Sequence, residues 1–326
     1  MDDRDNRSGR AVSLGDDGVS LSARNTPTLT YAAFSPVFHI NGEDAWIGGQ
    51  FMDGRAKGLV EQARGPILNA TEMAMRSVDQ VANRIRAVPI YKASLTALFP
   101  TVDLTQGESL FEAISLSIAA FEQTVLFSTF NSKYDRSLRG EIKLTKQEEL
   151  GRTLFFSQQF TNCSSCHQLQ PLPTSKKETF SNYEYHNIGT PSNRVLLRLG
   201  KEMDQDLLDV GLLGNPDITS LVNKGKFKVP TLRNIAVTAP YMHNGVFNDL
   251  STVLAFYNKY NSKNEKRQIN PETNERWVKP EVPENISLEL LQQGPALDHK
   301  KLAALEAFLE TLTDQRYEHL IHSFRN

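Results

Sequence analysis

Cysteine is almost absent from this 326-residue sequence, which contains only Cys163 and Cys166. Two thiols exclude a framework of several disulfides and a zinc site built from four cysteines. Long apolar runs are also lacking, and none approaches the roughly 20 residues that span a bilayer. The net charge is −2, so no positive excess indicates nucleic acid or a membrane surface as a partner.

The two cysteines belong to a single motif, in which His167 follows Cys166 directly. The two thiols can add to the two vinyl groups of haem, and the adjacent imidazole can reach the iron. Zinc would need four ligands, and adjacent Cys166 and His167 are awkward partners for one tetrahedral ion. A thioredoxin-like dithiol would need a βαβ context that the flanking sequence lacks. The motif therefore predicts a covalently attached haem c, with His167 as the proximal iron ligand.

A protein with covalent haem is expected to be exported, and we predict a periplasmic location. The first residues are polar and acidic, unlike a secretory signal. We therefore expect that the chain has been trimmed or begins late.

Helical periodicity dominates the rest of the sequence. Residues 72–88 and 109–129 have the apolar spacing of helices, and a last helix is expected over 300–313. Thr145 followed by Glu148 is a capping box that predicts a helix leading to the haem motif. Strand patterns are few and short. We predict a mostly α fold, with long loops.

An internal repeat indicates duplication. The Pro-Thr-Leu of residues 27–29 recurs at 230–232, and the glycine-ended segment 51–54 has a counterpart at 241–245. Each glycine leads into an apolar helical segment. We predict two cytochrome c-like domains related by duplication, an N-terminal one over 1–139 and a C-terminal one over 140–326. In the second copy the haem cysteines precede the proline by more than sixty residues, so a first haem motif would lie upstream of Met1.

The sixth ligand of the haem iron is less determined. Tyr257 shares a helical face with Leu250 and Leu254, so a tyrosine packed in the core is its simpler interpretation. The side chains that are chemically able to bind the iron are those of Met203, His186, Met242, His243 and Tyr257.

Several segments together resemble the bacterial di-haem cytochrome c peroxidase and MauG family. They are residues 227–234, 241–245, 24–29, 52–55 and 61–73, and the resemblance covers nearly the whole chain. It implies two cytochrome c domains with the active site at an N-terminal, high-spin haem. It also implies a low-spin C-terminal haem that relays electrons, and a calcium ion between the two.

The resemblance gives Glu72 the role of the distal glutamate of the peroxidatic haem, with Gln62 and Pro66 in the same pocket. A carboxylate above the iron can move a proton from one peroxide oxygen to the other. Tyr257 matches the sixth-ligand position of the C-terminal haem, where peroxidases have methionine and MauG-like proteins have tyrosine. An anionic oxygen ligand favours the ferric state.

The calcium site implied by the resemblance consists of Asn25, Thr238 and Pro240. One side-chain amide, two backbone carbonyls and waters form a ligand set that suits a hard cation.

Three features depart from the family pattern. The first haem motif is missing, and residues 13–18 lack the histidine that must leave the iron when peroxidases are activated. That second absence favours a peroxidatic site that is always open, as in MauG-like proteins. Met52 replaces the tryptophan that lies between the haems in the family, and Trp46 is the tryptophan nearest to it in sequence.

The function implied is that of a haem peroxidase or MauG-like oxidoreductase, which reduces hydrogen peroxide with electrons relayed through the C-terminal haem. The expected donor is a small cytochrome, a cupredoxin, or a partner protein whose side chain is oxidised. The alternative is a mono-haem electron-transfer protein with a degenerate N-terminal domain. A second Cys-x-x-Cys-His motif upstream of Met1 would distinguish the two.

Overall fold

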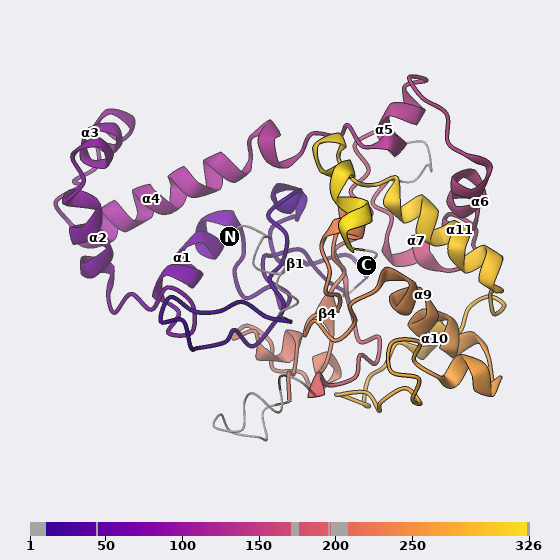
Figure 1. Cartoon of the computed structure of the whole chain (residues 1–326). Helices are drawn as coiled ribbons and strands as arrows, with labels where there is room; N and C mark the ends of the chain where they lie inside the picture. Colours follow the sequence, from indigo (N-terminus) through magenta and orange to yellow (C-terminus); the bar gives the residue numbers. More distant parts are fainter. Residues whose placement is uncertain (1–10, 44, 171–175, 195, 197–207, 325–326) are drawn as a thin grey trace.

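The computed structural model describes residues 11–43, 45–170, 176–194, 196 and 208–324, and it consists mainly of helices joined by long loops (Figure 1). The predicted mostly α architecture is therefore confirmed. The α-helices are α1 (Leu59–Leu68), α2 (Val78–Arg86), α3 (Pro89–Leu98), α4 (Gly107–Glu122), α5 (Lys133–Leu138), α6 (Lys146–Phe155), α7 (Cys163–Cys166), α9 (Leu250–Asn258), α10 (Leu288–Leu291) and α11 (His299–Glu310). The strands are β1 (His39–Ile40), β2 (Trp46–Ile47), β3 (Tyr185–His186) and β4 (Phe227–Lys228). None of the described helices is long and apolar enough to cross a membrane.

Helices α6 and α11 cross at close range in the C-terminal core. Gly151 makes this approach possible, because a Cβ atom there would lie 1.8 Å from the carbonyl oxygen of Ala304. The capping box of Thr145 and Glu148 begins α6 as predicted. The last helix begins one residue earlier than predicted and ends at Glu310, not at Thr313.

The helix predicted over residues 72–88 is wrong at its start. Glu72 lies in a turn, and Ala74 has a φ of 50°, a left-handed conformation that interrupts a helix. Helix α2 begins only at Val78, where the Ser77 side chain accepts a hydrogen bond from the backbone of Gln80. Helices α1 and α2 both pack on α4. Helix α4 itself begins at Gly107 and ends at Glu122, seven residues before the predicted end.

The predicted duplication is visible in the backbone. Tyr31 and Asn234 both have a φ of 62°. Each is followed by one turn of 3-10 helix, η2 (Ala32–Phe34) in the first copy and η6 (Ile235–Val237) in the second. The two Pro-Thr-Leu repeats therefore lead into the same local structure.

The glycine-ended segments also have matching structures. A β-bridge joins Gln50 to Ala56 in the first copy, and another joins Tyr241 to Phe247 in the second. The enclosed Gly54 and Gly245 have φ values of 68° and 63°, which other residues rarely adopt. Helices α1 and α9 follow at identical spacing, so Pro66 of α1 occupies the place of Tyr257 in α9.

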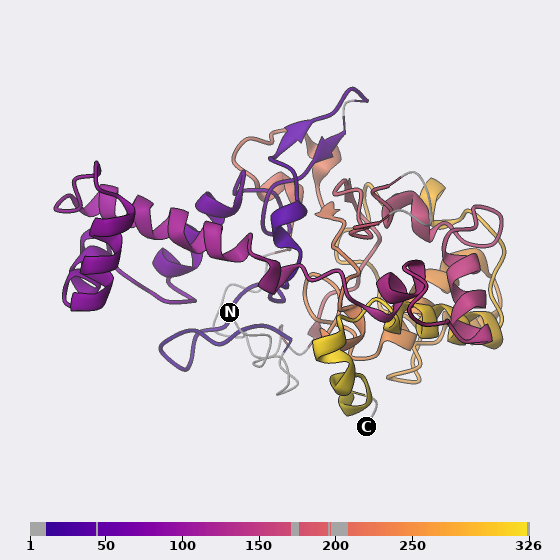
Figure 2. The same ribbon diagram turned by 90° about the horizontal axis from the view of Figure 1, so that it is seen from above.

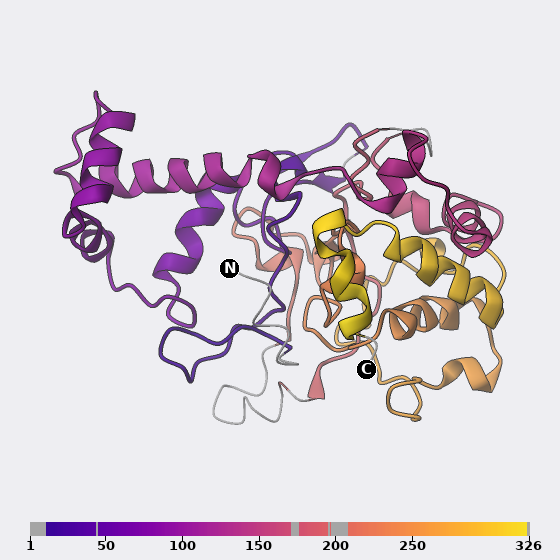
Figure 3. The ribbon, with the colours of Figure 1, turned by 45° about the horizontal axis from the view of Figure 1, so that its top comes forward.

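The first copy carries an insertion that ties the two halves together. Strands β1 and β2 pair antiparallel within it. Gly48, just after β2, donates its backbone N–H to the carbonyl of Tyr183, 3.0 Å away. Strand β3 pairs in turn with β4. In Figures 2 and 3 the helices α2 to α4 extend to one side of this central region, with the C-terminal helices on the other.

Candidate haem site

The haem attachment motif forms the short helix α7, which places both thiols on one turn. Cys163 and Cys166 are free cysteines, and the backbone N–H of His167 donates to the carbonyl of Cys163 at 2.8 Å. Asn162, which precedes the helix, donates its side-chain amide to the carbonyl of Leu290 at 3.0 Å. The attachment turn is thereby fixed to α10.

His167 is held in the state that an iron ligand needs. Its Nδ1 lies 3.2 Å from the carbonyl oxygen of Phe180, which fixes the ring and leaves Nε2 available for a metal. Burial lowers the pKa of His167 to about 4, partly opposed by the hydrogen bond to Phe180. The imidazole is therefore neutral at physiological pH, as coordination requires.

Tyr257 projects from α9 into the apolar cluster that also contains Cys163 and Met242. Burial raises the pKa of its phenol, and the nearby thiols of Cys166 and Cys163 raise it further. Among the described residues its hydroxyl has no hydrogen-bond partner. A partly buried phenol beside the attachment turn with an unused oxygen suits an iron ligand.

Two of the other ligand candidates are engaged elsewhere. His243 faces Glu281, with Nε2 3.1 Å from the carboxylate, and its ring stacks on Phe227 at 3.8 Å between centroids. Burial opposes protonation of His186, but hydrogen bonds to Cys166 and Glu184 outweigh it and raise the pKa to about 9. In the structure, His186 Nε2 lies 3.2 Å from the Glu184 carboxylate, which occupies this ring nitrogen.

Two candidates are not engaged in this way. Met242 packs, like Tyr257, against the C-terminal apolar cluster. Met203 lies outside the described residues.

The three residues predicted for the peroxidatic pocket lie close to one another. Gln62 and Pro66 are one turn apart on α1, and both are half-buried. The turn that holds Glu72 returns to this helix, because Met73 donates its backbone N–H to the carbonyl of Pro66 at 3.1 Å. Within the described part of the chain, the Glu72 carboxylate has no hydrogen-bond or ion-pair partner. It is free to act on a ligand.

Two of the three predicted calcium ligands meet. The buried Asn25 side chain donates its amide N–H to the carbonyl of Pro240, and Thr238 precedes Pro240 by two residues. An amide oxygen and carbonyls are suitable ligands for calcium. Among the described residues, no group of three or more His, Cys, Asp and Glu side chains could hold a metal.

Two arginines from the recognised segments have structural roles that the sequence did not reveal. Arg24 bridges the two halves, with salt bridges of 2.6 Å to Asp53 and 2.6 Å to Asp209. Arg233 is 1% exposed and pairs with Asp135. The sequence did not reveal either role, because the acidic partners are distant along the chain: Asp53 and Asp209 for Arg24, and Asp135 for Arg233.

The fold and the site together define a c-type cytochrome built from two related units. The donor set of Cys163, Cys166, His167 and Tyr257 fits haem c, with two thiols for the vinyl groups and two axial ligands for the iron.

Comparison with known proteins assigns the family. The family described as di-haem cytochrome c peroxidase matches residues 2–143. The chain is 49% identical over 324 residues to the methylamine utilization protein MauG of Paracoccus denitrificans, covering 99% of this chain and 83% of that protein. It is 33% identical over 246 residues to the cytochrome c peroxidase Ccp of Escherichia coli, covering 73% of this chain and 43% of that protein.

Solved structures agree. The diheme peroxidase BthA from Burkholderia thailandensis superposes with a TM-score of 0.84 at 30% identity, covering 97% of this chain and 78% of that one. A MauG-like protein associated with microbial copper homeostasis gives a TM-score of 0.66 at 27% identity, covering 94% of this chain and 80% of that one. The chain therefore belongs to the di-haem cytochrome c peroxidase and MauG family, whose members are haem peroxidases.

Proposed function

We propose that the protein reduces hydrogen peroxide at an N-terminal haem pocket formed by Gln62, Pro66 and Glu72. Electrons would reach it through the C-terminal haem c on Cys163 and Cys166. The overall change is two electrons and two protons added to one peroxide, which gives two waters. The observation that carries the proposal is the repetition of the haem-binding framework in both halves. We place the division at residues 139 and 140, and the location in the periplasm.

The two closing helices support a haem in each half. Helices α4 and α11 both end in an Ala-Phe-x-x-Thr sequence whose threonine lies just past the helix, and both threonine hydroxyls donate to the carbonyl of their phenylalanine, at 2.8 Å for Thr124 and 2.6 Å for Thr311. In α11 this phenylalanine, Phe308, is fully buried, because α6 covers it. Its counterpart Phe121 is 54% exposed among the described residues. We infer that a helix leading to a first haem motif covers Phe121.

The equivalence of Pro66 and Tyr257 supports an open peroxidatic site. The two residues occupy the same place in the two copies, but proline has no side-chain atom that can bind iron. With a haem bound in each half, Tyr257 would supply an oxygen ligand in the C-terminal half, whereas Pro66 would offer none and would leave room for peroxide in the N-terminal pocket.

The residues of the pocket divide the proton chemistry between them. Haem, when bound, supplies the iron that exchanges electrons with peroxide. Glu72 would accept the proton from the oxygen nearer the metal and return it to the leaving oxygen, acting first as base and then as acid. Gln62, one turn from Pro66, can donate a hydrogen bond that orients the bound peroxide.

Tyr257 is proposed as the sixth ligand of the C-terminal haem. Replacing Tyr257 with phenylalanine removes the phenolic oxygen, so we expect the low-spin ferric absorption and electron paramagnetic resonance signals of that haem to change to those of another ligation state. Tyr260→Phe is the matched control, because the Tyr260 hydroxyl donates to the carbonyl of Ile188 at 2.9 Å. Identical spectra for Tyr257→Phe and the wild type would return the ligand role to Met242.

Calcium is proposed at Asn25, Thr238 and Pro240. Asn25→Ala removes the only side-chain ligand, and we expect calcium affinity to fall by at least about tenfold, the loss that even an outer-shell partner typically causes. Isothermal titration of chelator-treated protein measures this. Asn264→Ala, at an exposed turn, is the control and should bind calcium normally. Equal affinities in the two variants would place the ion elsewhere.

The electron donor is proposed to be a small redox protein or a partner protein whose side chain is oxidised. The similarity to MauG and the tyrosine at 257 support the second possibility. The electron-carrier alternative is not favoured, because the relatives are peroxidases along with MauG proteins.

A further inference from the structure

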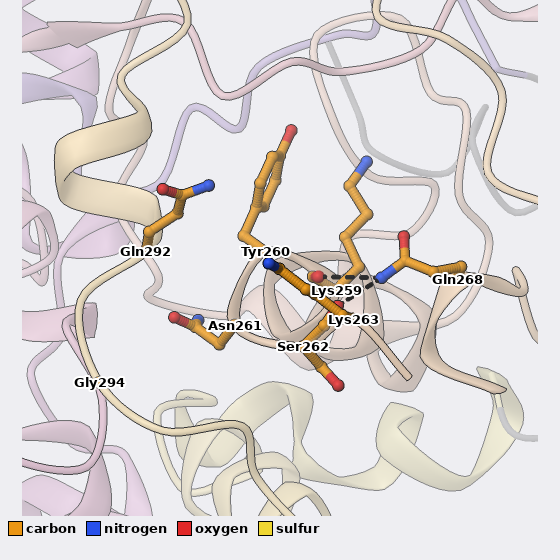
Figure 4. A pocket seen from close by; sticks show the side chains of 8 residues that line it. All are labelled: Lys259, Tyr260, Asn261, Ser262, Lys263, Gln268, Gln292 and Gly294. Atoms are coloured by element: carbon orange, nitrogen blue, oxygen red, sulfur yellow. Dashed lines mark hydrogen bonds between the residues drawn. The ribbon is translucent and has the colours of Figure 1, made fainter. Parts of the chain in front are cut away.

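We propose that a groove beside the haem attachment turn is the docking site of an acidic redox protein that donates electrons. The groove lies at the end of α9, where η7 (Lys259–Asn261) and the residues after α10 face each other (Figure 4). The inference rests on the proposed function in one respect only, namely that the C-terminal haem receives electrons from outside.

One wall of the groove lies against the segment that leads into the haem attachment turn. It encloses about 620 Å³ and is lined by Lys259, Tyr260, Asn261, Ser262, Lys263, Gln268, Gln292 and Gly294. A Cβ atom on Gly294 would lie 3.2 Å from the carbonyl oxygen of Phe160, three residues before Cys163. Asn261 donates to the carbonyl of Leu291 at 3.2 Å, which closes the wall formed by α10. A protein seated here therefore lies close to the segment that leads to Cys163.

The charge of the residues that line the groove indicates an acidic partner. Two lysines and no carboxylate line the groove, although the chain as a whole has a net charge of −2. Lys259 rests on aromatic rings, with Nζ 3.8 Å from the centroid of Phe256, and no ion pair neutralises it within the described residues. The groove is thus a local positive site.

The acidic side chains nearby do not cancel this charge. Glu265 is paired with Arg276. Glu289 lies on α10 but does not line the groove.

The rim favours a protein over a small anion. Phe160, whose backbone meets Gly294 of the groove, is 45% exposed, and Leu288, at the start of α10, is 43% exposed, so the neighbourhood of the two cations also offers apolar contacts. Transient redox complexes combine a small contact area with complementary charges, which steer the encounter and set its rate. An acidic partner with an apolar centre matches both features.

The test uses the haem-loaded, full-length protein and two forms of one donor. Ferrous mitochondrial cytochrome c is basic, and its succinylated derivative has the same fold but a negative charge. With peroxide present, we expect faster oxidation of the succinylated donor, at a rate that falls as salt is added. Lys263→Glu should slow that oxidation by about tenfold or more at low salt.

The controls separate docking from catalysis. Lys92→Glu makes the same charge change on α3, which lies at the opposite end of the molecule from α9 in all three overall views (Figures 1, 2 and 3), and should leave the rate unchanged. Peroxide turnover with a small uncharged reductant should be equal in all variants. Binding of ferric succinylated cytochrome c, measured by titration, needs no turnover and should weaken in Lys263→Glu only.

Equal rates with the basic and succinylated donors, or equal binding by Lys263→Glu and Lys92→Glu, would overturn the docking proposal. Failure of peroxide turnover with the small reductant would instead contradict the proposed function. The binding titration would still show whether the acidic donor docks in the groove.

Discussion

Replacing Glu72 with glutamine is expected to lower peroxide turnover by a factor of roughly 10² to 10⁴, the range that a positioned general acid–base group contributes. Glutamine keeps the size and polarity of the side chain but cannot carry the proton between the peroxide oxygens. The Glu72 carboxylate lies in the turn behind Pro66, without a partner among the described residues, so no structural contact is lost with it. Steady-state peroxide consumption with a reduced donor measures the effect.

Glu112→Gln is the matched control, because Glu112 is an exposed carboxylate on α4. It should retain full turnover. The spectrum of the C-terminal haem should be unchanged in both variants, since neither residue contacts α7. Full turnover by Glu72→Gln would remove the glutamate from the mechanism.

The second large effect is on stability. Replacing Arg233 with leucine is expected to lower the free energy of unfolding by about 3–5 kcal/mol, because it leaves the buried Asp135 carboxylate without its counter-charge. The Arg233 guanidinium donates to both Asp135 oxygens, at 2.6 Å and 3.0 Å, and to the carbonyl of Glu178 at 2.6 Å. Urea unfolding of the variant and the wild type gives the difference.

Two further variants identify the cause of that loss. Arg139→Leu breaks the exposed ion pair with Glu141, and such surface pairs contribute at most about 1 kcal/mol. In the double variant Arg233→Leu with Asp135→Asn no buried charge is left unpaired, and the amide oxygen can still accept from the backbone N–H of Ser132, so part of the stability should return. A small loss in Arg233→Leu, similar to that of Arg139→Leu, would mean that the pair is not a structural anchor.

The sequence predicted those parts of the fold whose signals are local. The capping box at Thr145 needs only residues three apart, and α6 begins where that pattern places it. The duplication was found from short repeats that share a backbone conformation. The start of α2 was missed because residues 72–77 have helical composition, while the left-handed Ala74 and the cap at Ser77 override it.

The site, too, was predictable only where its residues lie close together in sequence. Cys163, Cys166 and His167 are contiguous, so their shared chemistry can be identified without a structure. The ligand on the other side of the iron could not be chosen from periodicity, because what excludes His243 is Glu281, 38 residues away in sequence. The groove beside α7 could not be predicted from the sequence either, since its walls come from separate segments that meet only in the folded protein.

The central claim is that this chain is the relay half and the peroxidatic pocket of a two-haem enzyme. A pyridine haemochrome assay on protein expressed from the complete gene tests it most directly, because it counts covalent haems per chain. We predict two haems c, one of which is lost in Cys163→Ser with Cys166→Ser. A single haem per chain in the unaltered protein would contradict the claim and return the protein to the class of electron carriers.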